Sequence, residues 1–363
     1  MSHQEFMKRA IQLALKGKGK TSPNPMVGCV LVKNNKIIAE GWHQYCGGDH
    51  AEMMAIKKAG EKAKGARMYI TLEPCFHYGR TPPCIDQVIR SGIKEIFIGM
   101  KDPNPLVAGR SIKRLKEAGV KTTVGLSQDE LQKMNEAFIK YIKFKMPFVT
   151  AKCAQTLDGK IAAANGSSQW ITSLESRKSA HRLRDDFDAI CAGIKTVLKD
   201  NPGLNGVRKK NLKKIILDSS LQIPLKAKLF QGTSPSNCIM AATSKADPQK
   251  LKILQARGIN VLICPRRQGH IHLEWLFKEL AKREVTSILI EGGAHVIGCA
   301  LKENLVDKMH IYLAPKIIGS QKALSSVVGL NILKIGKAIQ LKNVTIQKIG
   351  EDFFFEGYVY RNH

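Results

Sequence analysis

Apolar and polar positions along the first part of the chain predict strands and helices in turn. Two apolar runs, 27–32 and 37–42, flank the polar tetrapeptide Lys33-Asn34-Asn35-Lys36, and this pattern predicts a β-hairpin. Beyond it, stretches with helical and with strand-like periodicity alternate, which predicts a largely parallel sheet with helices on its faces. The predicted helices are 50–62, 84–91 and 109–118, and the predicted strands are 67–72, 94–99 and 120–124.

A second alternating unit follows the first. An amphipathic segment at about 128–144 runs into Lys143-Phe144-Lys145-Met146-Pro147, where the pattern is interrupted. A new predicted strand, 148–154, begins after this proline, and a later strand at 287–290 leads into a helical run at 294–301. We therefore predict an α/β protein of two domains, 1–146 and 147–363, each of ordinary domain size.

Composition argues against a membrane protein and favours a reducing compartment. Hydrophobic residues make up 44% of the sequence, but no run reaches the roughly 18 to 20 apolar residues that a membrane helix needs. The amphipathic N-terminal pattern is interrupted by Lys8, Arg9 and Gln12, so we expect no signal peptide. The nine cysteines, an odd number in a long chain, favour reduced thiols and hence a cytoplasmic protein.

The formal net charge of +28 raises the question of nucleic-acid binding. The basic excess is spread over the chain, with 25 basic and 13 acidic residues in 1–146 and 33 and 17 in 147–363. It is mostly lysine, and the aromatic residues that stack on bases make up only 6%. We therefore attribute the charge to a general preference for lysine and expect no nucleic acid as partner, although a basic surface would help to collect a phosphorylated substrate.

Three metal-ligating residues come from two separate motifs. His50 lies in the motif His-Ala-Glu, and Cys75 and Cys84 belong to a second motif at 74–84. An imidazole and two thiolates are three of the four ligands of a tetrahedral zinc ion, and a fourth position left to water makes such a site catalytic. Zinc lowers the pKa of that water to roughly 7, and Glu52 is placed to move protons to and from it. A His/Cys/Cys site with a non-ligating glutamate is typical of zinc deaminases, so the sequence predicts a hydrolytic deaminase.

A structural zinc site is the alternative. Cys46 lies four residues before His50 and could supply a fourth protein ligand. The catalytic interpretation is favoured, because Glu52 would otherwise have no role beside the metal. Eight residues separate Cys75 from Cys84, in place of the two in Pro-Cys-x-x-Cys, and this spacing argues against the ordinary cytidine and transfer-RNA deaminases.

Longer motifs resemble the bifunctional deaminase–reductase family of riboflavin biosynthesis. They lie at 21–30 (TSPNPMVGCV), 50–52 (HAE), 71–84 (TLEPCFHYGRTPPC), 102–110 (DPNPLVAGR), 157–160 (LDGK), 168–173 (SQWITS) and 291–293 (EGG), so the resemblance spans nearly the whole chain. It implies an N-terminal cytidine-deaminase-like three-layer domain and a C-terminal dihydrofolate-reductase-like domain. It also implies Zn²⁺ and NADPH as cofactors, a phosphoribosyl pyrimidine as substrate, and a homo-oligomer.

The resemblance further implies two successive reactions. The first domain deaminates 2,5-diamino-6-(5-phosphoribosylamino)pyrimidin-4-one, and the second uses NADPH to reduce the ribosyl group to a ribityl side chain. Residues that match the family's reaction sites are His50, Cys75 and Cys84 on zinc, Glu52 as proton carrier, and Lys152, Asp200 and Glu291 in the reductase. The matching NADPH positions are Ala154, Trp170, Thr196, Asp200, Ser219 and Gly293. The matching substrate positions are Asn24, His43, His77 and Arg80 in the first domain and Ser168, Arg184, Leu204, Arg208 and Glu291 in the second.

Two departures from the family pattern lie near these positions. Phe76, next to Cys75, stands where the family usually has a serine, which removes a hydrogen bond in the loop but no zinc ligand. The run Gly-Leu-Asn-Gly-Val-Arg at 203–208 contains Gly206 where the family usually has a threonine between leucine and valine, and this change bears on the match of Arg208.

Two functions of other classes remain as alternatives. A nucleic-acid base deaminase would bind single strands in a salt-sensitive way. A zinc-stabilised scaffold would be indifferent to Glu52→Gln and would lose its metal on Cys46→Ala. Neither alternative accounts for the motifs in the second half of the chain.

Overall fold

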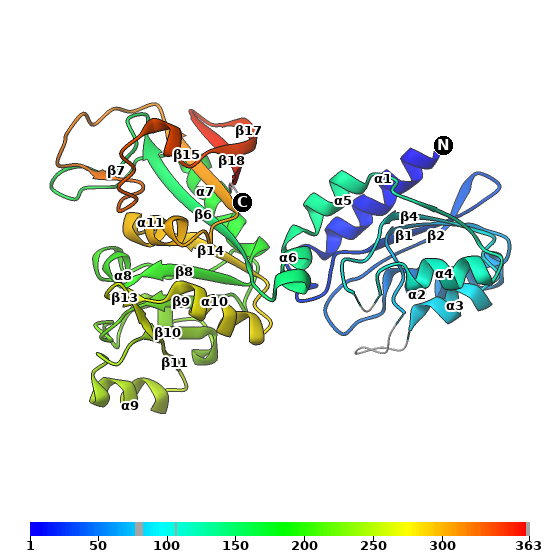
Figure 1. Ribbon diagram of the computed structural model, residues 1–363, viewed down its shortest axis with the longest axis horizontal. Coiled ribbons are helices and arrows are strands. Elements are labelled where there is room, and N and C mark those ends of the chain that lie inside the picture. The colour runs from blue at the N-terminus through cyan, green and yellow to red at the C-terminus, as the bar shows by residue number, and fades with distance from the viewer. Residues whose placement is uncertain (77–82, 106, 361–363) are drawn as a thin grey trace. The chain divides into compact units, whose positions relative to one another are not determined.

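The computed structural model describes residues 1–76, 83–105 and 107–360 (Figure 1). The chain forms two compact units, Met1–Met146 and Pro147–His363. Each unit has its own main sheet and its own hydrophobic core. The predicted α/β class is confirmed, and each unit is described by itself below.

The N-terminal unit is built on a five-stranded sheet with the order β2-β1-β3-β4-β5. The strands are β1 (Gly28–Lys33), β2 (Lys36–Trp42), β3 (Arg67–Leu72), β4 (Glu95–Met100) and β5 (Lys121–Val124). The helices are α1 (His3–Ala14), α2 (Ala51–Ala59), α3 (Cys84–Arg90), α4 (Arg110–Glu117), α5 (Gln128–Met134) and α6 (Glu136–Phe144), with 3₁₀ turns at Leu15–Gly17 and Gly60–Ala63.

This sheet is parallel in its alternating part, as predicted, and β1 alone runs against the other four strands. β1 pairs antiparallel with both β2 and β3, and the parallel pairs are β3–β4 and β4–β5. The predicted hairpin explains why β1 is reversed. Its turn residues Asn34 and Asn35 have φ of 50° and 60°, which suits a two-residue turn that reverses the chain. The crossover through α2 then brings β3 back in the direction of β2, on the other side of β1.

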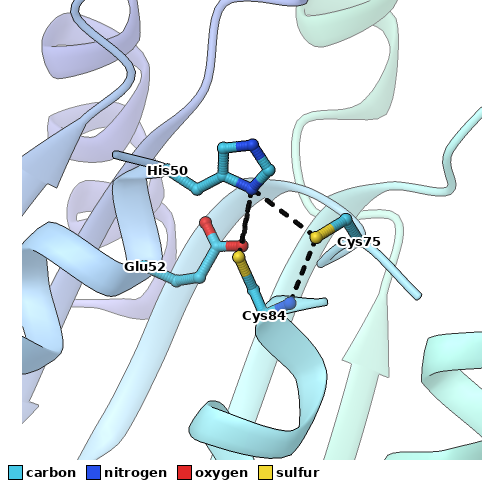
Figure 2. A group of neighbouring side chains, drawn as sticks. All are labelled: His50, Glu52, Cys75 and Cys84. Atoms are coloured by element: carbon cyan, nitrogen blue, oxygen red, sulfur yellow. Dashed lines mark hydrogen bonds and ion pairs between the residues drawn. The ribbon is translucent and has the colours of Figure 1, made fainter. Parts of the chain in front are cut away.

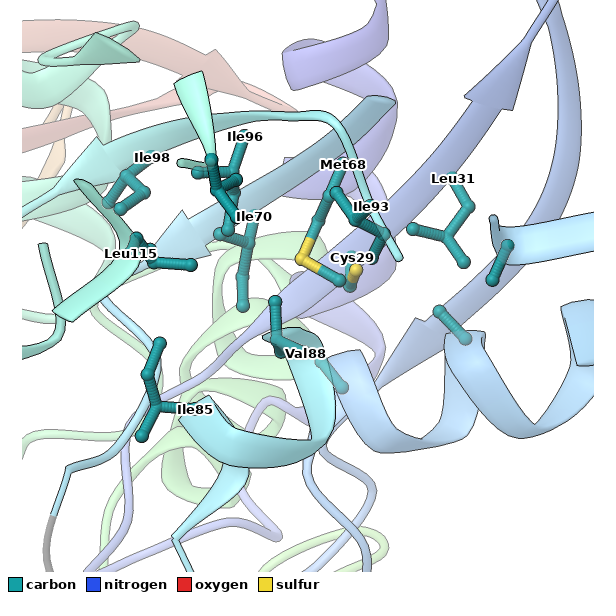
Figure 3. Packing of buried hydrophobic residues seen from close by; sticks show 14 of the residues in the cluster. Cys29, Leu31, Met68, Ile70, Ile85, Val88, Ile93, Ile96, Ile98 and Leu115 are labelled. Atoms are coloured by element: carbon teal, nitrogen blue, oxygen red, sulfur yellow. The ribbon is translucent and has the colours of Figure 1, made fainter. Parts of the chain in front are cut away.

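Helices cover both faces of the sheet and give the three-layer unit that the resemblance implied. On one face α1 packs Phe6 against Val30 and Tyr69. On the other face α2, α3 and α4 enclose an apolar cluster around Met68 and Ile70 (Figure 3). The inner strands are therefore buried on both faces, which explains why they are almost continuously apolar in sequence.

The segment predicted as one amphipathic helix at about 128–144 is two helices, because Asn135 separates α5 from α6. The backbone of Asn135 leaves the helical region, with φ of −107° and ψ of 22°. Its buried side chain accepts a hydrogen bond from the backbone N–H of Met26 at 2.8 Å and donates one to the Met26 carbonyl at 3.0 Å. A contact with a distant segment thus ends the helix, and apolar periodicity gives no sign of it.

The C-terminal unit is built on a nine-stranded sheet with the order β11-β10-β9-β8-β14-β6-β15-β18-β17. Its strands are β6 (Phe148–Thr156), β8 (Ala189–Gly193), β9 (Lys213–Leu217), β10 (Cys238–Ala242), β11 (Asn260–Ile263), β14 (Ser287–Glu291), β15 (Lys308–Ala314), β17 (Leu341–Ile349) and β18 (Asp352–Val359). The helices are α7 (Leu174–Leu183), α8 (Ile194–Asp200), α9 (Pro248–Ala256), α10 (Leu273–Lys282) and α11 (Ala294–Lys302). Short elements are β7 (Lys160–Ala162) with β16 (Leu324–Ser325), β12 (Arg266–Arg267) with β13 (His270–Ile271), and 3₁₀ turns at Arg184–Asp186, Lys228–Phe230, Pro235–Asn237 and Ile335–Lys337.

Neighbouring strands of this sheet run parallel throughout the part with the order β11-β10-β9-β8-β14-β6-β15. Their carboxyl ends therefore lie along one edge of the sheet. β18 and β17 complete the sheet in antiparallel fashion. Ligands of open α/β sheets bind beyond the carboxyl ends of the strands, so we expect a ligand site at this edge. Among the described residues, every helix is too short or too polar to span a bilayer.

Gly28 provides a test of the packing of α1 on β1. A Cβ at this position would overlap the carbonyl oxygen of Ala10 and lie 2.8 Å from the backbone nitrogen of Ala14. Both obstacles are backbone atoms, so Gly28→Ala must displace the helix. We expect the free energy of unfolding of the N-terminal unit to fall by about 3 kcal/mol, as measured by urea denaturation followed through Trp42 fluorescence in a background without the other tryptophans.

Gly336→Ala is the matched control, because nothing lies within 4 Å of the added Cβ. It should leave the denaturation profile unchanged. A Gly28→Ala protein as stable as the parent would contradict the close approach of α1 to β1.

Candidate active sites

Four residues of the N-terminal unit, His50, Glu52, Cys75 and Cys84, form a group of potential metal ligands (Figure 2). Their ligand atoms all lie within 4.8 Å of one another. His50 is the N-cap of α2 and Glu52 lies in the first turn of that helix. Cys75 follows β3, and Cys84 is the first residue of α3, where the helix dipole favours a thiolate. Two helix starts and one strand end therefore bring the predicted zinc residues together.

The ligand atoms have the spacing of a tetrahedral zinc site. Nδ1 of His50 lies 3.0 Å from Sγ of Cys84 and 3.5 Å from Sγ of Cys75. Bonds of about 2.0 to 2.3 Å to a tetrahedral zinc ion place neighbouring ligand atoms about 3.5 Å apart. Oε1 of Glu52 lies 3.9 Å from the same Nδ1, which places the carboxylate beside the fourth position. The donor set and its geometry fit zinc.

Burial and mutual hydrogen bonds set the pKa values of this group. The Glu52 side chain is buried, and desolvation raises its pKa. Hydrogen bonding from Cys84, assisted by His50, lowers the pKa of Cys75 to about 4. The same pairing with Cys75 raises the pKa of Cys84 and raises that of His50 to about 9. At neutral pH the metal-free group therefore holds one thiolate, one thiol and one imidazolium.

The residues around the group favour the catalytic site over the structural one. Among the described residues, the group contains Glu52 and not Cys46. Phe76, the departure next to Cys75, packs against the apolar cluster under α2, α3 and α4. Packing thus anchors the loop at the position where a serine would have supplied a hydrogen bond.

His43, which is paired with Asn24, lies beside this group. His43 is buried, with Nε2 3.1 Å from Nδ2 of Asn24 and Nδ1 3.1 Å from the backbone oxygen of Asp49. Its ring meets that of His50 edge to face, with the centroids 5.6 Å apart. Burial lowers the pKa of His43 and keeps the ring neutral. The predicted His77 and Arg80 lie outside the described residues.

Glu73 is a functional-site residue that the sequence reasoning missed. Its side chain is 2% exposed, and its carboxylate accepts backbone N–H groups of Asp102, Gly109 and Ile112 at 3.2, 3.0 and 3.4 Å. The hydroxyl of Ser111 also donates to the carbonyl of Pro74 at 2.6 Å. The segment that carries Cys75 is thereby fixed to the start of α4. The sequence signal for this role is the position of Glu73, an acidic residue between a buried strand and Pro74-Cys75.

Lys152, Arg184 and Glu291 form a buried charged group in the C-terminal unit. Glu291 ends β14 and is the register partner of Lys152 on β6, whose Nζ donates to Oε1 at 3.3 Å. Arg184 binds both carboxylate oxygens, at 2.8 Å through Nε and 3.0 Å through Nη2. Burial alone would raise the pKa of Glu291, but the charges of Lys152 and Arg184 outweigh it and lower this pKa to about 2. Glu291 and Lys152 are thus paired, which removes the cost of their apolar surroundings.

Four predicted NADPH positions lie along the carboxyl edge of the sheet. Ala154 is near the end of β6, Thr196 follows β8, Ser219 follows β9 and Gly293 follows β14. Gly292 and Gly293 have φ of 84° and 85°, and a Cβ on either would lie within 3.7 Å of the Thr196 side chain. Side chains here would fill the space before the first turn of α11, so the glycine turn fits a phosphate group.

The other predicted reductase positions differ in exposure. Trp170 is 62% exposed and stacks on the guanidinium of Arg177, 3.9 Å from the ring centroid. Asp200 is exposed at the end of α8, Ser168 is half-buried, and Leu204 is buried. The exposure of Trp170 and Asp200 leaves both side chains accessible to a ligand.

Gly206 allows the loop after α8 to wrap around Asp185. A Cβ at Gly206 would overlap Oδ1 of Asp185, whose carboxylate accepts the backbone N–H of Arg208 at 3.1 Å. The Arg208 side chain is 85% exposed and lies 3.5 Å from the same carboxylate. In the same loop, the backbone oxygen of Asn205 accepts a hydrogen bond from Arg184 at 3.0 Å. The departure at Gly206 therefore positions Arg208 against Asp185 and leaves its guanidinium open to solvent.

Family models match a large part of each unit. A family model described as the RibD C-terminal domain matches residues 147–355. A model described as the cytidine and deoxycytidylate deaminase zinc-binding region matches residues 1–100.

Full-length relatives and solved structures match as well. The chain is 43% identical to the riboflavin biosynthesis protein RibD of Actinobacillus pleuropneumoniae, over 98% of this chain and 95% of that protein. It is 38% identical to the RibD of Escherichia coli, over 97% and 98%. A structure of Acinetobacter baumannii RibD matches with a TM-score of 0.87 at 34% identity, over 98% of each chain. A Thermotoga maritima structure described as a diaminohydroxyphosphoribosylaminopyrimidine deaminase/5-amino-6-(5-phosphoribosylamino)uracil reductase matches with 0.83 at 34%, also over 98% of each.

The protons held by the metal-free group lead to a prediction. At pH 7 His50, with a pKa of about 9, and Cys84, with its raised pKa, are protonated, whereas Cys75 is ionised. Zinc displaces these protons, so we expect binding of one zinc ion to release about two protons near neutral pH and its affinity to fall as the pH is lowered. Isothermal titration calorimetry in buffers of different ionisation enthalpy measures this number.

Cys46→Ser is the control for this titration. It should keep both the zinc affinity and the number of protons released. Loss of zinc from that variant would restore the structural-site alternative.

Proposed function

The chain belongs to the RibD family of bifunctional deaminase–reductases in riboflavin biosynthesis, with a zinc-binding deaminase domain and an NADPH-dependent reductase domain, and on that premise we propose which residues carry each reaction. We assign 1–146 to the deaminase and 147–363 to the reductase. The observation that carries the deaminase assignment is the convergence of His50, Cys75 and Cys84 around Glu52.

In the deaminase, His50, Cys75 and Cys84 hold the zinc. When bound, zinc acts as a Lewis acid that lowers the pKa of a coordinated water. Glu52 takes the proton of the attacking water and transfers it to the exocyclic nitrogen, so that ammonia leaves the pyrimidine carbon. The raised pKa of this buried carboxyl suits a group that must both accept and donate a proton near neutral pH.

The substrate of this step is the diaminopyrimidine that carries a phosphoribosylamino group. Asn24 and the neutral His43 bind and orient it beside the zinc group, where their mutual hydrogen bond fixes both side chains. His77 and Arg80 are assigned to the substrate through the family resemblance, with the cation facing the phosphoribosyl arm.

In the reductase, NADPH supplies the hydride. Glu291 holds Lys152 and Arg184 in place at the carboxyl edge, where Lys152 positions the ribosyl group and supplies a proton. Asp200, exposed at the end of α8, contacts both ribosyl group and cofactor. The assigned NADPH residues are Ala154, Trp170, Thr196, Asp200, Ser219 and Gly293, and the assigned substrate residues are Ser168, Arg184, Leu204, Arg208 and Glu291.

We further propose that the protein acts in the cytoplasm as a homo-oligomer and does not bind nucleic acid. None of the nine cysteines, all of which lie among the described residues, forms a disulfide, which suits a reducing compartment. β17 forms one edge of the nine-stranded sheet, and Val344 and Ile346 on it are 48% and 58% exposed. An exposed apolar edge strand is a surface that a second copy of the chain would cover.

A two-part assay with the phosphoribosyl diaminopyrimidine tests the residue assignments. Glu52→Gln should reduce ammonia release by about 10²- to 10⁴-fold, because general acid–base catalysis contributes about that much. The same variant should oxidise NADPH normally when the deaminated intermediate is supplied. Glu291→Gln should slow NADPH oxidation and leave ammonia release normal, because it removes the carboxylate that Lys152 and Arg184 share.

Each variant is the control for the other, because the two residues lie in different units. Normal ammonia release by Glu52→Gln would contradict the assignment of proton transfer to Glu52, whereas a zinc-loaded parent protein that releases no ammonia would favour the scaffold. Salt-sensitive binding of single-stranded DNA or RNA by the parent protein would favour the nucleic-acid deaminase.

Ile346→Lys tests the proposed oligomer. A lysine in the centre of a β17 interface places a buried charge there, so light scattering should show a loss of the parent oligomer. Ile253→Lys, at a 42% exposed position on α9, is the matched control and should keep the parent mass. A monomeric parent protein, or an unchanged mass for Ile346→Lys, would refute the assignment of β17.

A further inference from the structure

One strand end beside the assigned NADPH residues has no assigned function. Along the carboxyl edge these residues follow β6, β14, β8 and β9, and the next strand in the sheet is β10. The chain leaving β10 has the sequence Thr243-Ser244-Lys245. Both the backbone N–H and the hydroxyl of Thr243 donate to the backbone oxygen of Ser219, at 3.0 and 2.9 Å. The turns after β9 and β10 are therefore held together.

The order of residues along the edge indicates how a dinucleotide lies on it. The hydride-donating ring belongs beside Lys152 and Glu291, and the turn Gly292–Gly293 fits the pyrophosphate. The adenosine then extends over β9 towards β10. Neighbouring strands lie about 4.8 Å apart, so two spacings, about 10 Å, separate the β14–β8 junction from the β9–β10 junction. One ribose with its phosphates covers that length.

The turn after β10 has the chemistry of a phosphate site. Ser244 and Lys245 are exposed and offer a hydroxyl donor and an ammonium group. Asp218, on the neighbouring turn, is buried and accepts two backbone N–H groups at 2.9 and 2.8 Å. The carboxylate of Asp247 caps α9 and accepts a backbone N–H at 2.8 Å. Both nearby carboxylates are thus engaged with the backbone.

We propose that Ser244 and Lys245 bind the 2′-phosphate of NADPH and make the reductase select NADPH over NADH. The proposal rests on the proposed function, because it takes Ser219 and Gly293 as NADPH residues. The 2′-phosphate is the group that distinguishes the two cofactors, so a residue that binds it determines specificity without taking part in hydride transfer.

Calorimetric titration of the full-length protein tests the proposal without turnover. The probes are 2′,5′-ADP and 5′-AMP, which differ by the 2′-phosphate, together with NADP⁺ and NAD⁺. For Lys245→Ala we expect the affinity for 2′,5′-ADP and NADP⁺ to fall about tenfold to a hundredfold, as for loss of a hydrogen bond to a charged group. The affinity for 5′-AMP and NAD⁺ should stay the same. Ser244→Ala should lower the affinity for 2′,5′-ADP and NADP⁺ by a smaller factor. Lys245→Arg should retain most of the preference for 2′,5′-ADP over 5′-AMP.

Lys252→Ala is the matched control, because it also removes one exposed lysine, from α9. It should leave the affinity for all four probes unchanged. Unchanged affinity for 5′-AMP and NAD⁺ checks that the C-terminal unit of each variant is folded, since all of the substitutions lie in that unit. If the parent protein prefers 2′,5′-ADP and Lys245→Ala keeps that preference, the assignment of this turn is wrong while the proposed function stands. If the parent protein binds none of the four probes, the proposed NADPH residues fail and this inference fails with them.

Discussion

A charged side chain can be buried only where partners are fixed around it, and both sites of this protein depend on that constraint. In the deaminase unit the carboxylate of Glu73 is satisfied by three backbone N–H groups, and this arrangement fixes the segment that carries Cys75. In the reductase unit Glu291 is satisfied by Lys152 and Arg184, which draws two strands and the turn after α7 together. The partners that permit burial are also the groups that position the chemistry.

The sequence predicted the parts of the sites that lie within short motifs. Ligand type, spacing and the neighbouring Pro83 were sufficient to predict that His50, Cys75 and Cys84 lie together, because His50 and Cys84 start helices and Cys75 follows a strand whose apolar pattern is clear. The strand–turn–helix at Glu291 to Gly293 was recognisable for the same reason. Local pattern determines where an element begins and ends, and these residues lie at or close to such positions.

The features that the sequence did not predict depend on partners far away in the chain. Asn135 interrupts a helix because it binds Met26, and Glu73 is buried because α4 covers it. The pairing of β1 with β3 was not predicted for a related reason. Periodicity reports which face of a strand is apolar, but this antiparallel pairing follows from how the chain crosses over through α2. Interactions of this kind have no local signature.

The division into two units bears on the order in which the protein is made. All strand pairs of the N-terminal unit lie between residues 28 and 124, so this sheet can close while the rest of the chain is still being synthesised. β6 begins the second unit but pairs with β14 and β15, and Lys152 meets Glu291 only after a further 139 residues. On a translating ribosome the metal site is therefore complete long before the reductase site, and a nascent chain that stalls before β14 carries the first site alone.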